Sequence, residues 1–244
     1  EMADDAFQNT QYTIALEHYL KAMEKGKTKP EVLFNIAECY RYTGNHEKAL
    51  EFYNRAIEAG YTEPNAVYLQ GNLFIQQGKY AEAEKKLNEF LEKQPNDKDA
   101  IRLLNSVKFA QKAQQEPTIY TIQNTGAMNT QYNDYAAAFL KNKVVFTSSR
   151  AEAGANIYSY DGQGFSNLFE TTYNIKDKSW TKPAKIVVLS TPFNDGTFTY
   201  CEKTKTAYFE QCNGANGKES FCTIMEAVYD EANNTWSTPK AITT

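Results

Sequence analysis

The stretch LFNIAECYRYTGNHEKALEFYNRAIEAG, residues 33–60, places small and apolar side chains at helical spacing on both sides of Gly44. These side chains are Leu33, Ile36, Ala37 and Tyr40 before the glycine and Ala49, Tyr53 and Ala56 after it. Glycine readily adopts the left-handed backbone that ends many helices, so we expect the first helix to stop at Gly44. The stretch therefore predicts two antiparallel helices that approach closely at their alanines.

The pattern recurs every 34 residues along the first half of the chain. Gly44 recurs as Gly78, and Ala49 has counterparts at Ala15 and Ala83. A 34-residue period with small residues at fixed positions is typical of tetratricopeptide (TPR) repeats, which stack into a solenoid. Residues 3–113 closely resemble this family. The resemblance implies a protein-binding scaffold rather than an enzyme.

The two ends of this solenoid depart from the repeat. The first repeat is incomplete at its front. After Pro95, the sequence NDKDAIRLLNSVKFAQKAQ predicts a terminal helix with Asn96 or Asp97 as its N-cap. A helix in this position covers the last apolar face of a short solenoid.

The composition changes near residue 117, and this change predicts two domains. Alanine, glutamate, lysine and leucine dominate before it, whereas threonine, asparagine, tyrosine, phenylalanine and valine dominate after it. We assign residues 1–116 to a TPR domain of about three repeats and residues 117–244 to an all-β domain. The predicted fold class is α + β multidomain, with an N-terminal TPR α-solenoid followed by part of a WD-like β-propeller.

A second, longer repeat is the basis of the propeller prediction. The matched segments are 168–186 with 224–242, 130–139 with 191–200, and 143–150 with 205–212. We expect four short strands in each unit, with NIYSY and LFETTYN among those of the first. Four strands in a repeat of roughly 40–60 residues are typical of a propeller blade. Two blades cannot close a ring, so the chain is expected to be a truncated part of a larger propeller protein.

The order of these parts resembles a known family. NTQYND and KNKVVFTSSR, followed by TPFNDGTFTY and EAVYDEANNTWSTP, resemble the periplasmic propeller after TPR repeats in Bacteroidota outer-membrane proteins of the OmpA family, the PorE-like group above all. This resemblance implies a non-enzymatic periplasmic scaffold in an outer-membrane-associated type IX secretion or gliding complex. A peptidoglycan-binding domain usually follows in that family, so contact with peptidoglycan is expected only through a domain that this chain lacks.

The resemblance to TPR proteins also implies a binding groove, which the first helix of each repeat lines. Carried onto this sequence, its positions are Phe34, Glu38, Arg41, Tyr42, Tyr68, Asn72, Ile75, Gln76, Arg102, Ser106 and Phe109. The Lys/Asn/Arg set that clamps a peptide carboxylate in some TPR domains is not found there, so binding of acidic C-terminal peptides is not predicted. The competing interpretation is that the aromatic side chains only pack within the solenoid.

Charge and motif content exclude several other classes. The net charge is −4 without a basic stripe, which argues against nucleic acid, and no apolar run is long enough to span a membrane. His18 and His46 lie apart from cysteines at metal spacing, and phosphate-loop and nucleophile motifs are missing, so no metal, cofactor or catalytic residue is predicted. Asp134 and Asp195 recur at equivalent positions, which favours a role in turns. A propeller-type hydrolase and a cytosolic TPR adaptor are the alternatives.

The four cysteines allow three complete pairings. Cys212 and Cys222 bound a loop rich in glycine and asparagine between two expected strands, and we hypothesise that they form a disulfide. Such a bond would indicate an oxidising compartment such as the periplasm. Cys39 is expected to be a buried free thiol, and Cys201 to be buried in a strand. The alternative is that Cys212 and Cys222 are reduced thiols of a cytosolic protein.

Overall fold

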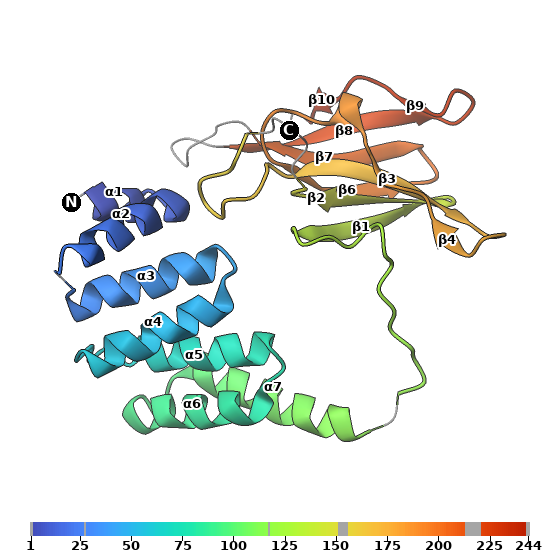
Figure 1. Cartoon of the computed structure of the whole chain (residues 1–244). Helices are drawn as coiled ribbons and strands as arrows, with labels where there is room; N and C mark the ends of the chain where they lie inside the picture. Colours follow the sequence, from blue (N-terminus) through green and yellow to red (C-terminus); the bar gives the residue numbers. More distant parts are fainter. Residues whose placement is uncertain (1, 27, 117, 151–155, 213–220, 243–244) are drawn as a thin grey trace. The chain divides into compact units, whose positions relative to one another are not determined.

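The computed structural model of the chain describes residues 2–26, 28–116, 118–150, 156–212 and 221–242 (Figure 1). It divides into two compact units, Glu1–Ile122 and Gln123–Thr244. The first unit is helical, and the second consists of β-sheets. The division falls at residue 122 because residues 118–122, without regular secondary structure, group with the helices.

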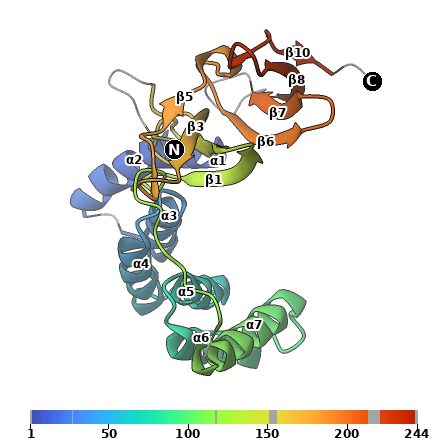
Figure 2. The same ribbon diagram turned by 90° about the vertical axis from the view of Figure 1, so that its right-hand side faces the viewer.

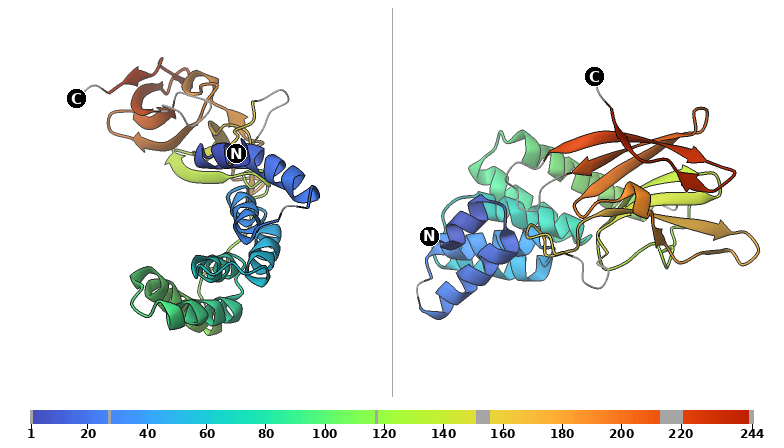
Figure 3. Two further views of the ribbon diagram at one scale, coloured as in Figure 1. Left: turned by 90° about the vertical axis from the view of Figure 1, so that its left-hand side faces the viewer. Right: turned by 90° about the horizontal axis from the view of Figure 1, so that it is seen from above.

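The helical unit is a series of antiparallel helices. In its described residues these are α1 (Met2–Gln8), α2 (Tyr12–Glu24), α3 (Pro30–Tyr42), α4 (His46–Glu58), α5 (Asn65–Gln76), α6 (Tyr80–Lys93) and α7 (Lys98–Gln115). Each helix contacts the next one along the chain. Figure 2 and the left view of Figure 3 show the helices following one another in a curved row. This is the arrangement of a solenoid in which α1/α2, α3/α4 and α5/α6 form pairs and α7 is the terminal helix.

Local sequence signals explain where these helices begin and end. Gly44 and Gly78 follow α3 and α5 with φ angles of 79° and 70°, a left-handed backbone that glycine adopts at little cost. Asp97 caps α7, because its carboxylate accepts a hydrogen bond of 2.8 Å from the amide of Ala100. Asp97, and not Asn96, is therefore the N-cap of the terminal helix.

Small residues let the helices approach closely. The equivalent residues Ala15, Ala49 and Ala83 are all fully buried. A Cβ atom added to Gly71 of α5 would lie 3.1 Å from the side chain of Leu87 on α6, which leaves little room even for alanine. The close approach of neighbouring helices therefore recurs every 34 residues, together with the buried alanines.

The second unit contains two antiparallel sheets, one from each sequence repeat. Sheet 1 consists of β1 (Asp134–Leu140), β2 (Lys143–Ser148), β3 (Asn167–Asn174), β4 (Ser179–Trp180) and β5 (Ala184–Lys185). Sheet 2 consists of β6 (Asp195–Cys201), β7 (Thr206–Cys212), β8 (Cys222–Asp230), β9 (Thr235–Trp236) and β10 (Lys240–Ala241), and the 3₁₀ helix η1 (Val187–Leu189) precedes it. In each sheet the first three strands pair in chain order, and two short strands share the fourth position.

One strand predicted from the sequence is not formed. The segment NIYSY, residues 156–160, has only an isolated bridge between Ile157 and Gly164. The amide of Gly162 instead donates to the carbonyl of Tyr158 at 2.9 Å, and the Tyr158 ring packs on Phe165 with centroids 5.2 Å apart. The aromatic residues of this segment therefore anchor a turn, although their alternation resembles that of a strand.

The alignment of the second strands is corrected by one residue. Phe146 pairs with Phe169 and Phe209 pairs with Met225, so Phe146 is equivalent to Phe209, an offset of 63 residues (209 − 146). The ungapped sequence match has an offset of 62 (205 − 143). Two residues join β1 to β2, but four join β6 to β7. The longer turn raises the offset between the repeats by two residues from the first strand to the second. Because side chains alternate along a strand, a one-residue error exchanges the two faces of a sheet.

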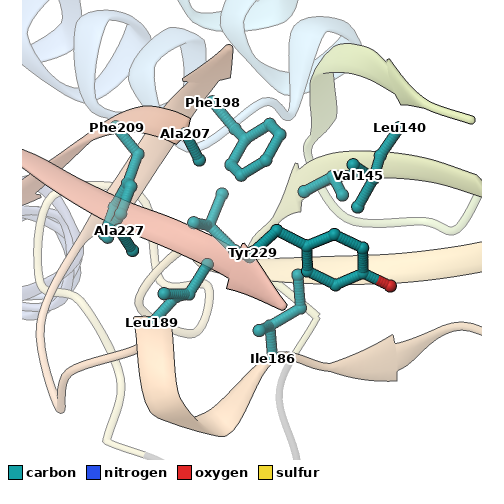
Figure 4. Packing of buried hydrophobic residues seen from close by; sticks show 10 residues of the cluster. Leu140, Val145, Ile186, Leu189, Phe198, Ala207, Phe209, Ala227 and Tyr229 are labelled. Atoms are coloured by element: carbon teal, nitrogen blue, oxygen red, sulfur yellow. The ribbon is translucent and has the colours of Figure 1, made fainter. Parts of the chain in front are cut away.

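The two sheets pack face to face around one apolar core. Leu140 and Val145 of sheet 1 meet Phe198, Phe209 and Tyr229 of sheet 2, and all five are less than one-tenth exposed (Figure 4). Stacked antiparallel sheets of this kind agree with the expected repeat. The described strands form two open sheets and not a ring, so the propeller itself is not confirmed.

The outer face of sheet 1 is covered by the segment that precedes β1. Phe146 and Phe169 are buried there, with Met128 packed against them. The guanidinium of Arg150 lies 5.1 and 5.0 Å from the two ring centroids and donates to the carbonyl of Met128 at 2.8 Å. Arg150 therefore holds this covering segment in place.

Candidate functional site

The predicted groove residues on α7 are exposed, whereas most of those on α5 are partly buried. Tyr68, Asn72 and Ile75 are partly exposed, whereas Gln76, Arg102, Ser106 and Phe109 are exposed. Residues three and four apart share one face of a helix, so each set forms a stripe along its helix. Helices α5 and α7 are in contact, and together they offer a polar and aromatic surface.

Helix α7 contributes the most open part of this surface. A hollow of about 480 Å³ is lined by Lys98, Ile101, Arg102, Asn105, Ser106 and Phe109. Phe109 is 74% exposed and Ile101 is 40% exposed. A terminal helix normally presents a polar outer face, so these two apolar side chains make this face a candidate contact surface.

Glu38 is not part of an accessible groove, and its assignment is corrected. Only 8% of the residue is exposed, and its carboxylate accepts hydrogen bonds from Arg41 at 2.9 and 2.6 Å. It also accepts one from the hydroxyl of the fully buried Tyr53 on α4. Burial and the charge of Glu38 both raise the pKa of Tyr53, so that hydroxyl remains a donor. Glu38 therefore joins α3 to α4 and is not free to bind a partner.

The other predicted residues of α3 also make internal contacts. The Phe34 ring stacks on Tyr61 with centroids 4.5 Å apart. Tyr42 stacks on Tyr12 at 4.0 Å, and the Arg41 guanidinium lies 4.0 Å from the Tyr42 ring centroid. These contacts agree with the packing interpretation for α3, whereas the role of the α5 and α7 residues stays a prediction.

Asp134 and Asp195 both organise the chain before the first strand of their sheet. Each accepts hydrogen bonds from the amide and hydroxyl of the threonine four residues earlier. Burial acts to raise the pKa of Asp134, but hydrogen bonds from Ser148, Arg150 and its threonine lower it overall. Asp195 has no arginine partner in the described residues, and burial raises its pKa to about 6. The duplicated aspartates are turn residues, as the repeat predicts.

The predicted Cys212–Cys222 disulfide is present in the structure. The two residues are directly opposite each other at one end of the β7–β8 ladder. Cys39 is buried, as expected, and burial raises the pKa of its thiol to about 12. Cys201 ends β6 and is half-buried rather than buried.

Two further properties hold for the part of the chain that the structure describes. None of its helices is long and apolar enough to cross a membrane. It also contains no group of three or more histidine, cysteine, aspartate or glutamate residues arranged to hold a metal ion.

One exposed aromatic cluster was not singled out by the sequence reasoning. Tyr173 and Trp180 lie in the repeated segment 168–186, and with Phe139 they border open surface in sheet 1. The alignment of the two repeats does show a difference at this place. Ile175 and Lys178 of the first repeat align with Glu231 and Asn234 of the second.

Comparison with protein families identifies the helical unit. Residues 8–90 match a family described as anaphase-promoting complex, cyclosome, subunit 3, and residues 68–113 match a tetratricopeptide repeat family. Both matches lie within the helical unit. The chain therefore has N-terminal TPR helical repeats, followed by antiparallel sheets.

Solved structures similar to the chain include TPR domains. The first TPR domain of human RPAP3 is 23% identical, with a TM-score of 0.41, over 46% of this chain and 89% of that one. The Sgt2 TPR domain from Aspergillus fumigatus is 23% identical, with a TM-score of 0.41, over 50% and 84%. The type III secretion chaperone SycD of Yersinia enterocolitica, in complex with a peptide of the translocator YopD, is 18% identical, with a TM-score of 0.41, over 45% and 88%. No curated protein matches the chain.

Proposed function

We propose that the chain is a non-enzymatic scaffold that binds a protein segment along the exposed face of α5 and α7. The observation that carries this proposal is the hollow on α7, where Arg102 and Phe109 are accessible in a TPR unit. TPR units are protein-interaction modules, and their exposed apolar surface marks contact sites.

The chemistry of this face favours an extended or helical peptide with an apolar side chain. The amides of Asn72, Gln76 and Asn105 can each donate and accept hydrogen bonds, which matches peptide groups. Phe109 supplies an aromatic anchor of the kind that dominates binding energy at interfaces. The α3 part of the predicted groove contributes rigidity instead, because Glu38 and Arg41 bind each other.

Site-directed photo-crosslinking tests this proposal in the cell. A photoreactive phenylalanine analogue is placed at Phe109, at Asn72, or at the exposed Lys93 of α6 as a control. We expect the same partner to be captured from the first two positions and not from the control position. Equal capture at all three positions, or capture at none, would contradict binding at this face.

We further propose that the protein acts in the periplasm, as part of an outer-membrane-associated secretion or gliding complex. The supporting observations are the Cys212–Cys222 disulfide, a bond that favours an oxidising compartment, and the sequence resemblance to such proteins. Thiol labelling of the protein in intact cells tests the compartment. Labelling of both Cys212 and Cys222 without reductant would favour the cytosolic adaptor.

We also propose that the sheets belong to a propeller-type stack that continues beyond sheet 2. Leu168 and Ile186, 0% and 7% exposed, lie between the two sheets. Their equivalents on the outer face of sheet 2, Ile224 and Ile242, are 56% and 42% exposed. Apolar residues at interface positions without a covering sheet support a further sheet at this face. In a longer chain, Ile224→Asp should lower stability strongly, whereas in this chain it should have little effect.

A further inference from the structure

The sheet unit contains the same aromatic pair twice, in two different environments. Tyr173 and Trp180 have ring centroids 5.0 Å apart in sheet 1, and Tyr229 and Trp236 have centroids 4.7 Å apart in sheet 2. Each pair consists of directly paired residues at the same place in its repeat. The two environments can therefore be compared residue by residue.

In sheet 2 the tyrosine of the pair is buried beside Lys143, the first residue of β2 in sheet 1. Tyr229 is 7% exposed, and the Lys143 ammonium lies 5.8 Å from its ring centroid and donates to Asn234 at 2.7 Å. The neighbouring Lys141 forms an ion pair of 2.6 Å with Glu231. At this contact between the two sheets, two lysines of sheet 1 lie beside the aromatic pair of sheet 2. Each lysine is held by a polar residue of sheet 2.

In sheet 1 the tyrosine of the pair is 37% exposed, and the pair lies where two hollows meet. One hollow, of about 330 Å³, includes Phe139 and Ile175, which are 79% and 81% exposed. The other, of about 480 Å³, includes Lys178 and the segment 123–127. Tyr173 and Trp180 line both hollows, which together we term the Tyr173–Trp180 groove.

The groove lacks the two groups that hold lysines in sheet 2. Ile175 takes the place of Glu231, and Lys178 takes the place of Asn234. In the described part of the chain no carboxylate lines either hollow, and Lys178 makes no ion pair. A lysine-bearing turn like that of sheet 1 would meet an apolar side chain and a like charge here. The groove is therefore not a second copy of the joint between the sheets.

We propose that the Tyr173–Trp180 groove is a docking site for an acidic peptide segment with an apolar side chain. The apolar side chain would lie against Phe139, Tyr173 and Ile175, where exposed aromatic and aliphatic surface is removed from water. A carboxylate of the same segment would approach the exposed Lys178, which forms no ion pair with a described residue. This site is separate from the α5–α7 face, so the scaffold would carry one peptide site on each unit.

The two tryptophans of the chain make this proposal directly measurable. With 5-fluorotryptophan incorporated, the full chain should give one ¹⁹F signal from Trp180 and one from Trp236, assigned with Trp180→Phe. The probe is a terminally blocked hexapeptide of alternating glutamate and leucine. Matched probes replace every glutamate by lysine, or every leucine by serine. We expect the glutamate–leucine peptide to shift the Trp180 signal, the other two to have little effect, and the Trp236 signal to stay in place.

Charge reversal at one position supplies the decisive control. Lys178→Glu should weaken binding of the glutamate–leucine peptide at least about tenfold and favour the lysine–leucine peptide. Lys182→Glu makes the same charge change at an exposed residue outside both hollows and should change binding less than about twofold. An unchanged Trp236 signal shows that each variant is folded.

Three outcomes would overturn the proposal. These are an unmoved Trp180 signal, equal responses to the glutamate and lysine peptides, and equal effects of the two lysine variants. Phe109→Ala should leave the Trp180 response intact, which separates this groove from the face proposed on α7. Loss of photo-crosslinking at α7 and loss of the fluorine shift are therefore independent results.

Discussion

The Glu38 network predicts a large loss of stability from one substitution on α3. In Glu38→Ala the carboxylate that joins Arg41 to Tyr53 disappears, and the Tyr53 hydroxyl is left in a fully buried site. The Arg41 side chain remains 24% exposed and can recover some hydration, whereas Tyr53 cannot. Removing one partner of a buried ionic contact costs about 3–5 kcal/mol, and we expect the lower half of that range.

Urea denaturation followed by circular dichroism at the helical minimum measures this loss, because the α-helices of the described chain lie in one unit. With a slope of about 2 kcal/mol per molar urea, the midpoint of that transition should fall by roughly 1.5–2 M. Glu51→Ala is the matched control, since its ion pair with Lys48 on α4 is about half exposed and should leave the midpoint unchanged.

A double-mutant cycle tests the physical cause. Tyr53→Phe alone removes the hydroxyl and leaves Glu38 with Arg41, at a cost of about 1–2 kcal/mol. In the Glu38→Ala background the same change should cost nothing or even stabilise, because the orphaned hydroxyl is removed. If the two changes are additive, or if Glu38→Ala shifts the midpoint no more than Glu51→Ala does, the reasoning is refuted.

Three further predictions concern the sheet unit. Burial raises the pKa of Asp195 to about 6 from 3.8, so the folded state binds this proton more tightly and the contribution of this group to stability falls as the pH rises from about 4 to 7. Asp195→Asn should remove this contribution of roughly 2–3 kcal/mol, so the stability of the variant relative to the wild type should rise over this pH range; an unchanged difference in Tm would argue against it. Arg150→Met should cost about 2 kcal/mol in tryptophan-detected unfolding, because Asp134 loses a buried partner at 2.8 Å, and a neutral result would mean that its other hydrogen bonds suffice. Reduction of the Cys212–Cys222 bond should cost roughly 2–3 kcal/mol in the wild type and nothing in Cys222→Ser, so an equal effect of reductant on both would exclude the disulfide as the cause.

Helix positions could be predicted from the sequence because their signals are local. Gly44, Gly78 and the N-cap Asp97 act through the backbone of residues within one turn. The 34-residue period then orders the helices, since each one contacts its neighbours along the chain. No distant residue has to be known for either inference.

The environment of Glu38 could not be predicted in the same way. Its spacing from Phe34 and Tyr42 places it on the groove-facing stripe of α3. Whether that position is open depends on Tyr53, which comes from another helix and reaches the carboxylate only after α3 and α4 have packed. The same holds for Phe34, whose ring stacks on Tyr61 beyond the end of α4.

The sheet unit shows most clearly which features follow from the sequence and which follow only from the tertiary structure. The repeat of Tyr173 and Trp180 as Tyr229 and Trp236 was visible in the sequence, and the structure places both pairs equivalently. The sequence did not show which side chains of β2 and β7 point to the same face of their sheets. The reason is that the turn after β6 is two residues longer than the turn after β1. A one-residue shift inverts a strand, and only the hydrogen-bonded register fixes it.

The sequence by itself determined the TPR repeats, and it indicated a change from helices to strands and a cysteine pair at the β7–β8 hairpin, because each depends on composition or on spacing along the chain. The tertiary structure alone decided which repeated side chains are covered. Tyr229 is buried beside Lys143 of sheet 1, whereas Tyr173 at the equivalent position borders an open groove. Burial is a property of what packs against a residue, and two equal stretches of sequence acquire different surroundings once a fold places them at different positions in a stack.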